Sequence, residues 1–118
     1  MNLTNDSRFK ERLEKAIEAR ARLTDYFVPV QGLVRPALAY LAELDGAQAR
    51  LILGDINVSV KGRGGGVRVS AENLVEADRV CQMLRKTTPP DVHFRWSTRV
   101  TIITALYAYA EHILAAAQ

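Results

Sequence analysis

The chain has 118 residues, of which 48% are hydrophobic and 25% charged, a balance typical of a folded globular protein and not of a disordered one. This length leaves room for one hydrophobic core, so we expect a single domain. The formal net charge is +3, and the surplus lies in residues 61–118, where eight basic residues face five acidic ones. Such a basic surplus is compatible with a polyanionic partner, although many proteins of this charge bind no nucleic acid.

One cysteine, Cys81, excludes an internal disulfide, and the N-terminal residues lack the basic and apolar regions of a secretory signal. These two features indicate a cytoplasmic protein. The most apolar stretch, residues 100–117, contains Glu111, His112 and two threonines. We therefore expect a buried helix there and no association with a membrane.

Two helices are predicted in the first 50 residues. Apolar residues recur at three- and four-residue steps over residues 7–27, as on one face of a helix. They are Phe9, Leu13, Ala16, Ile17, Leu23 and Phe27. A second helix is expected between Pro36 and Gly46, because proline suits a first helical turn and glycine a stop. The two helices could pair as a helical hairpin, an N-terminal extension (1–50) of residues 51–118 within the single domain.

After residue 50 the apolar period changes from about 3.6 to 2. Ile56, Val58 and Val60 alternate with Asn57, Ser59 and Lys61, which predicts a strand. The glycine-rich run 62–66 is expected to turn the chain, so that residues 67–69 return as a short antiparallel strand. This run lacks the spacing of a nucleotide-binding P-loop, but a hairpin tip with Lys61 and Arg63 could hold a DNA backbone.

Two more helices are predicted, over residues 71–86 and from Ser97 or Thr98 to the C-terminus. The last one is apolar on nearly all sides, and a 118-residue monomer can barely bury such a helix. We therefore expect a homodimer. The predicted dimer-interface residues are Ile103, Leu106, Tyr107, Ala110, Ile113 and Leu114.

No catalytic or metal-binding pattern is found in the sequence. Cys81 lies on the apolar stripe of its helix, where a free cysteine acts as a small hydrophobe. His93 and His112 lack the spacing of metal ligands, and Trp96 fits a core position better than a base-stacking one. The sequence thus predicts a binding protein that is not an enzyme and needs no cofactor or metal.

Residues 67–74 (VRVSAENL) resemble the strand-to-helix entry of the ribbon-helix-helix family of Arc and MetJ repressors, and residues 97–111 (STRVTIITALYAYAE) are similar to its second helix. Together they span about residues 56–115. The resemblance implies an α+β homodimer whose antiparallel β-ribbon lies in the major groove, while the N-terminus of the last helix binds phosphate. Arg68 would then face the bases, and Ser97, Thr98 and Arg99 would contact phosphate.

Two functions follow from these patterns. The first is a DNA-binding transcriptional regulator of bacterial type; because the strand at residues 56–61 could be the ribbon instead, its base readers would include Asn57, Ser59 and Lys61. The predicted DNA-binding residues are Asn57, Ser59, Lys61, Arg63, Arg68, Ser97, Thr98 and Arg99. The alternative is a protein-interaction module, such as an adaptor, inhibitor or chaperone, that docks a partner through its sheet or through residues 7–45.

Overall fold

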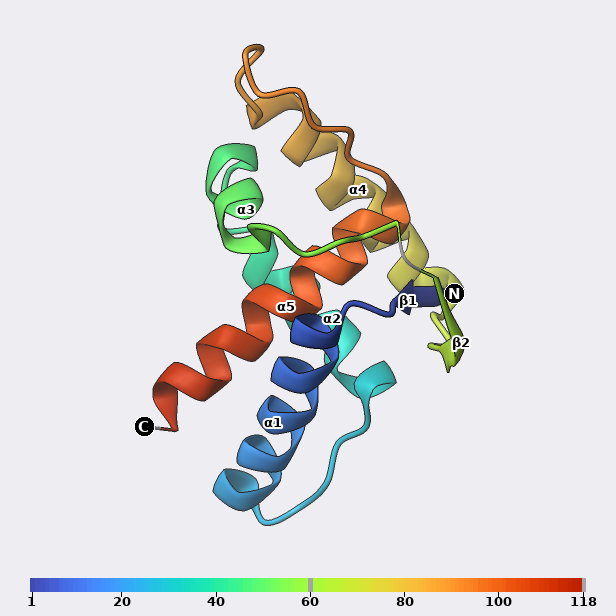
Figure 1. The fold of residues 1–118 in the computed structure, drawn as a ribbon, viewed down its shortest axis with the longest axis vertical. Coiled ribbons are helices and arrows are strands. Elements are labelled where there is room, and N and C mark those ends of the chain that lie inside the picture. The colour runs from blue at the N-terminus through green and yellow to red at the C-terminus, as the bar shows by residue number, and fades with distance from the viewer. Residues whose placement is uncertain (60, 118) are drawn as a thin grey trace.

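The computed structural model describes residues 1–59 and 61–117, with the side chains of 61–65 excepted. Within these residues the chain forms helices joined by short connections, and two short strands (Figure 1). In chain order the elements are β1 (Asn2–Thr4), α1 (Ser7–Thr24), α2 (Val30–Leu41), α3 (Gly46–Leu53), β2 (Lys61–Gly66), α4 (Ala71–Thr87) and α5 (Thr98–Ala116).

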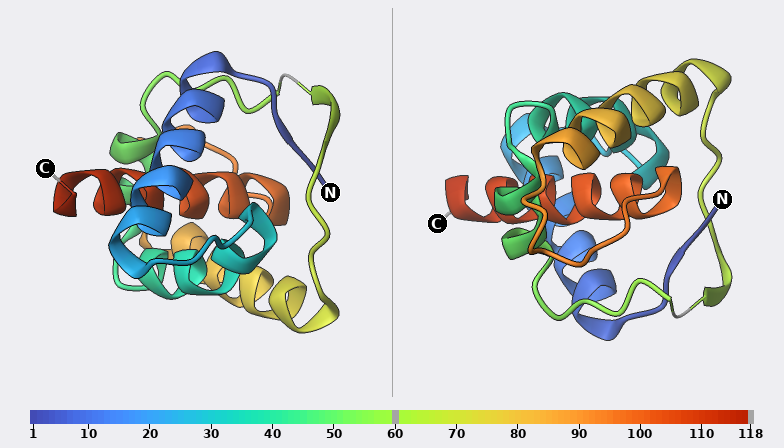
Figure 2. Two further views of the ribbon diagram at one scale, coloured as in Figure 1. Left: turned by 90° about the horizontal axis from the view of Figure 1, so that it is seen from below. Right: turned by 90° about the horizontal axis from the view of Figure 1, so that it is seen from above.

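The last helix, α5, lies at the centre of the molecule. All four other helices pack against it, α1 and α2 most extensively, and Figure 2 shows α5 crossing the middle of the structure in both views. Every residue from 100 to 106 is buried. The hydroxyl groups of Thr101 and Thr104 donate to the carbonyls of Ser97 and Val100 one turn earlier, at 2.7 and 2.8 Å, so their burial leaves no hydroxyl proton unsatisfied.

A single chain is therefore sufficient to bury this helix. Ile103, Leu106 and Ala110 are at most 1% exposed and Ile113 is 7% exposed, while Tyr107 and Leu114 are half-buried. Tyr107 stacks on Phe9 of α1 with ring centroids 6.3 Å apart. The premise that a monomer of this size can barely bury the helix was wrong, because four helices converge on it. Homodimerisation stays a prediction that no longer has this support.

The predicted change to a strand-like period after residue 50 is wrong at residues 51–53, which are the end of α3. Asp45 and Gln48 form a reciprocal cap, in which the Asp45 carboxylate accepts from the Gln48 N–H at 2.8 Å and the Gln48 side-chain oxygen accepts from the Asp45 N–H at 3.1 Å. Gly46 thus begins α3 and does not end a helix, and a Cβ there would lie 2.0 Å from Thr88 Oγ1. The packing of α3 against the end of α4 therefore favours a helix in this segment.

The predicted ribbon-helix-helix fold was also wrong. In the described part of the chain, the one strand pairing joins β1 to β2, antiparallel and irregular, with Asn2 opposite Gly66 and Thr4 opposite Lys61. Neither residues 56–59 nor residues 67–69 form a strand, so the ribbon of that family is missing and the protein is mostly helical instead of α+β.

The N-terminus explains why the expected hairpin does not form. The Val67 N–H donates to the Met1 carbonyl at 2.7 Å, and the Met1 amino group donates to the Val67 carbonyl at 2.9 Å. Met1 thus occupies both backbone groups of Val67, which the predicted hairpin would have paired with the preceding strand. The Asn57 N–H donates to Asp6 Oδ2 at 3.0 Å, which removes a second potential ladder bond.

The two helices predicted after residue 70 are confirmed as α4 and α5, and Cys81 and Trp96 lie in the core as predicted. Ser70 caps α4 and Ser97 caps α5, each accepting from the backbone N–H three residues later. Cys81 is buried, as is Trp96, and both belong to one hydrophobic cluster that contains residues from the first 50 and the last 68 positions. Residues 1–50 thus contribute directly to the core around α5.

Candidate functional site

The loop that follows α3 contains two of the predicted DNA-binding residues. Asn57 and Ser59 are exposed, but the Asn57 side-chain oxygen accepts from the Ser59 N–H at 3.1 Å and from the Ser59 hydroxyl at 2.7 Å. The Asn57 carbonyl accepts from the Thr4 hydroxyl. These polar groups therefore stabilise the loop against β1.

The start of α5 contains three more of these residues. Ser97 Oγ accepts from the Val100 N–H at 3.1 Å, which caps the helix. The Arg99 guanidinium donates through Nε to the Asn2 carbonyl at 2.8 Å and through Nη1 to the Val58 carbonyl. Arg99 thus joins β1, the loop after α3 and α5, while Thr98 is half-buried and forms none of these contacts.

The structure brings most of the predicted DNA-binding residues to one side of the molecule. Arg99 contacts Asn2 and Val58, and Arg68 is exposed directly after Val67, which pairs with Met1. The side chains of Lys61 and Arg63 lie outside the described residues. Among the predicted DNA-binding residues whose side chains the structure describes, Arg68 is exposed and has no assigned hydrogen bond. Arg99, Asn57 and Ser97 instead form hydrogen bonds within the chain. The binding of DNA by these residues stays a prediction.

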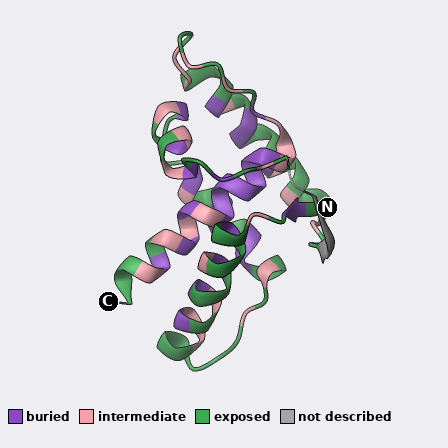
Figure 3. Cartoon of the chain, viewed as in Figure 1, coloured by how far each residue is buried: buried purple, intermediate pink, exposed green. Residues whose placement is uncertain are grey.

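A second surface lies at the turn between α1 and α2, which we call the apolar corner and define as Leu23, Tyr26 and Phe27. Their exposed fractions are 62%, 59% and 67%. Figure 3 shows this end of α1 and the turn after it as mostly exposed, in contrast to the buried start of α5. Three exposed large apolar side chains within five residues concentrate apolar surface in this turn, and exposed apolar patches often mark interaction sites.

The backbone of this turn is fixed by local bonds. Asp25, with φ of 61°, adopts the left-handed conformation that ends α1, and the Thr24 hydroxyl lies 2.8 Å from the Arg20 carbonyl and 3.2 Å from the Tyr26 carbonyl. Val28 turns inward and packs closely on Gly32, where a Cβ would lie 2.7 Å from Val28 Cγ1. The turn is therefore anchored on both sides of its exposed aromatic residues.

Arginine side chains accompany the apolar corner. The Arg20 guanidinium lies over the Tyr26 ring, 5.5 Å from its centroid, a cation–π arrangement that restrains the ring. Arg20 Nη1 is buried without a hydrogen-bond partner among the described residues. Residues 20–29 contain two arginines, Arg20 and Arg22, and one acidic residue, Asp25, so the segment that contains the corner has a net positive charge.

The sequence patterns assigned Leu23 and Phe27 to the buried stripe of the first helix, and this was wrong. The helix ends at Thr24, so Phe27 leaves the helical face. A signal for the corner was present in the run Tyr26-Phe27-Val28-Pro29, because consecutive apolar residues before a proline break a period of 3.6.

Ionisable groups elsewhere form structural contacts. The Arg12 guanidinium donates to both oxygens of Glu111, at 2.6 and 2.8 Å, and this hydrogen bonding raises the pKa of Arg12. Burial raises the pKa of Tyr107, which lies beside the same pair. The described residues include no cluster of three or more histidine, cysteine or acidic side chains placed to hold a metal. No helix among them has the length and apolar character needed to span a bilayer.

Comparison of the chain with protein-family models, with curated proteins and with solved structures gives no significant match. The ribbon-helix-helix resemblance of residues 67–74 and 97–111 thus has the support neither of a family model nor of the fold. The apolar corner is a candidate interaction site because its three large apolar side chains are exposed.

Proposed function

We propose that this protein is a protein-interaction module that inserts its apolar corner into an apolar recess of a partner protein. One observation carries the proposal: three large apolar side chains within five residues are each about 60% exposed or more, on a turn that the chain holds in place. This is the interaction function expected for residues 7–45, now assigned to Leu23, Tyr26 and Phe27.

The energetics favour a protein surface as the occupant. Full burial of a large apolar side chain contributes about 1.5–3 kcal/mol, so three of them form a substantial anchor. Tyrosine and arginine are among the residues most enriched at the centres of protein interfaces, and the corner has Tyr26 restrained by Arg20. Because the turn is already ordered, less conformational entropy is lost when a partner binds.

The shape and charge of the corner specify the partner further. The corner lies at one end of the long axis of the molecule, at the bottom of Figure 1, so it is a projection that fits a recess. The two arginines and single aspartate of residues 20–29 favour a recess with an acidic rim, because complementary charge increases the association rate and disfavours other partners.

DNA binding, the other function predicted from the sequence, has weaker support. Its proposed ribbon is missing, and Arg99, Asn57 and Ser97 are engaged in contacts within the chain. A basic surplus confined to residues 61–118 is its remaining support. A mobility-shift titration with mixed-sequence DNA at two salt concentrations provides the direct comparison, since phosphate binding weakens steeply with salt.

The test of the proposed function places a photo-crosslinker at residue 27 and, in a separate protein, at residue 51. Leu51 is the matched control because it is an exposed leucine, 81% accessible, on a different helix. We expect one protein to be crosslinked from residue 27 and not from residue 51 in cells that contain this chain.

Binding to the protein identified in this way is then measured with purified components. We expect Tyr26→Ser and Phe27→Ser each to weaken the affinity by about tenfold or more, which corresponds to about 1.4 kcal/mol, and Leu51→Ser to leave it unchanged. Circular dichroism and a thermal melt confirm that the variants fold. Equal crosslinking from both positions, or unchanged affinity of the Tyr26 and Phe27 variants, would refute the proposal.

A further inference from the structure

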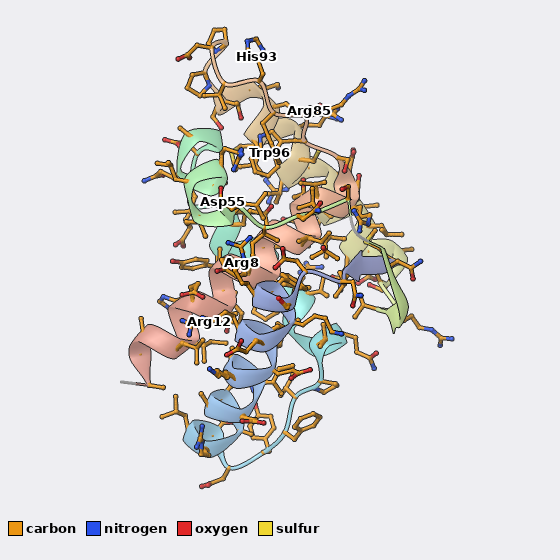
Figure 4. The ribbon with its side chains drawn as sticks, viewed as in Figure 1. Arg8, Arg12, Asp55, Arg85, His93 and Trp96 are labelled. Atoms are coloured by element: carbon orange, nitrogen blue, oxygen red, sulfur yellow. The ribbon has the colours of Figure 1, made fainter. Side chains whose placement is uncertain are left out.

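A small cavity lies at the opposite end of the molecule, between the end of α4 and the loop that leads to α5. Its volume is about 270 Å³. The residues that line it are Arg85, Thr88, Pro89, Pro90, Val92, Phe94, Arg95 and Trp96. Figure 4 shows Arg85 and Trp96 close together near the top of the molecule. The cavity therefore combines apolar walls with two permanent positive charges.

Arg85 is held in place by the backbone that forms the cavity. Its Nε and Nη2 donate to the Trp96 carbonyl at 3.0 and 2.8 Å. Neither Arg85 nor Arg95 is part of an ion pair among the described residues. A guanidinium anchored by a neutral carbonyl keeps its full charge and its remaining N–H groups for a ligand, and little side-chain entropy is lost on binding.

The apolar walls are also fixed. The Trp96 indole N–H donates to Thr88 Oγ1 at 2.8 Å, and the Thr88 hydroxyl donates to the Leu84 carbonyl at 2.6 Å. Phe94 meets Trp96 edge to face with ring centroids 4.8 Å apart. These contacts make the cavity a preformed site, as small-molecule sites usually are.

Three further observations limit the ligand. The Arg50 guanidinium lies over the Phe94 ring at 4.8 Å, so this face of the ring is not free to stack on a nucleobase. A volume of 270 Å³ is near the lower limit for ligand pockets, which suits a compact molecule and not a long chain. The loop has one acidic residue, Asp91, and it does not line the cavity.

We infer that this cavity binds a small organic anion, with its carboxylate or phosphate group held by Arg85 and Arg95 and its compact apolar part against Pro89, Val92 and Phe94. Charge-assisted hydrogen bonds to the guanidinium groups favour a ligand with an anionic group. Burial of apolar surface favours a ligand whose other part is apolar. This site is separate from the apolar corner and does not depend on the proposed function.

The single tryptophan of the chain provides a specific probe, because the Trp96 indole N–H resonance of ¹⁵N-labelled protein reports directly on the cavity wall. We expect benzoate and phenyl phosphate to shift this resonance in a saturable way at concentrations up to about 10 mM, which corresponds to weak, fragment-like binding. Benzyl alcohol, which lacks the charge, and inorganic phosphate, which lacks the apolar part, should each bind at least tenfold more weakly.

Variants test the role of the arginines. We expect Arg95→Gln to weaken binding of the two aromatic anions by tenfold or more. Arg68→Gln, which removes the same charge from an exposed position outside the cavity, should leave binding unchanged. The inference is overturned if neither anion shifts the Trp96 resonance, if benzyl alcohol or inorganic phosphate binds as tightly, or if both variants behave alike.

Discussion

The core of α5 and the apolar corner are two apolar regions that differ in solvent exposure: the first is buried and the second is exposed. Residues 100–106 of α5 are all buried, and four helices of the same chain cover them. Leu23, Tyr26 and Phe27 are also large and apolar, but each is about 60% exposed or more. The difference shows that apolar composition predicts that a segment tends to be buried. Whether the same chain or another molecule buries it depends on how the helices are arranged.

This comparison also separates stability from function. Burial of apolar surface is the main favourable contribution to folding, so the centre of α5 should determine the free energy of unfolding. The apolar corner buries little surface in the monomer and should contribute little to it. We therefore expect substitutions in the two regions to differ in the property that they change.

The largest expected effect is in α5. Leu106→Ala should lower the free energy of unfolding by about 2–5 kcal/mol, because it removes buried apolar surface and leaves a cavity. Leu51→Ala makes the same chemical change at a site that is 81% exposed and should change it by about 0.5 kcal/mol or less. Urea denaturation measures both. Equal losses in the two variants would contradict the central position of α5.

A smaller effect is expected at Asp6, which links the start of α1 to the loop after α3. Its carboxylate accepts from the Arg8, Phe9 and Asn57 N–H groups. Asp6→Ala should cost about 1 kcal/mol, the usual effect of losing an N-cap. Urea denaturation at pH 7 measures this loss, and Asp6→Asn, which keeps an acceptor oxygen, should lose less.

The same residue gives a pH dependence of known sign. The backbone hydrogen bond from Asn57 is the main cause that lowers the pKa of Asp6 below its ordinary value of 3.8. A lowered folded-state pKa means that the ionised carboxylate stabilises the fold above pH 3.8, and that this contribution is lost as the pH falls through the folded-state pKa. Unfolding at pH 7 and near pH 2–3 should show a smaller acid loss in Asp6→Asn than in the natural chain.

The ion pair between Arg12 and Glu111 joins α1 to the outer half of α5. Both side chains are about one-third exposed, at 34% and 36%. Arg12→Ala should therefore cost only about 0.2–1 kcal/mol, as for other solvent-accessible pairs. High salt should reduce the difference between the variant and the natural chain. A loss of several kcal/mol would show that this pair is part of the core.

The smallest effect on stability is expected in the apolar corner. Phe27→Ser should change the free energy of unfolding by about 0.5 kcal/mol or less, because the ring is 67% exposed. The same substitution should weaken partner binding by about tenfold or more. A strongly destabilised Phe27→Ser protein would mean that the corner belongs to the fold, and the contrast with α5 would then disappear.

Much of the helical structure could be predicted from the sequence, because caps and apolar stripes act over a few residues. Ser70 and Ser97 cap their helices as their positions before apolar stripes indicate. The strands could not be predicted in this way. The alternation of Ile56, Val58 and Val60 is typical of a strand, but the contacts of Asn57 with Thr4 and Asp6 come from residues about 50 positions away.

The candidate sites also combine features that the sequence shows with features that only the fold creates. The charge of Arg85 and Arg95 is evident from the sequence, but only the fold places both residues at one cavity, where Arg85 donates to the carbonyl of Trp96. The exposure of the apolar corner likewise depends on where α1 ends, and the left-handed Asp25 sets that end. At both sites, long-range contacts or backbone geometry determine whether a side chain is exposed to a ligand or partner.

The sequence by itself determined that α5 is buried, since a helix that is apolar on nearly all sides is unstable in water. Only the tertiary structure decided that the other helices of the same chain cover it and that the N-terminus pairs with the glycine-rich strand. The physical reason is the range of the interactions. Periodicity and capping are fixed by neighbouring residues, whereas burial depends on segments that meet only in the folded chain.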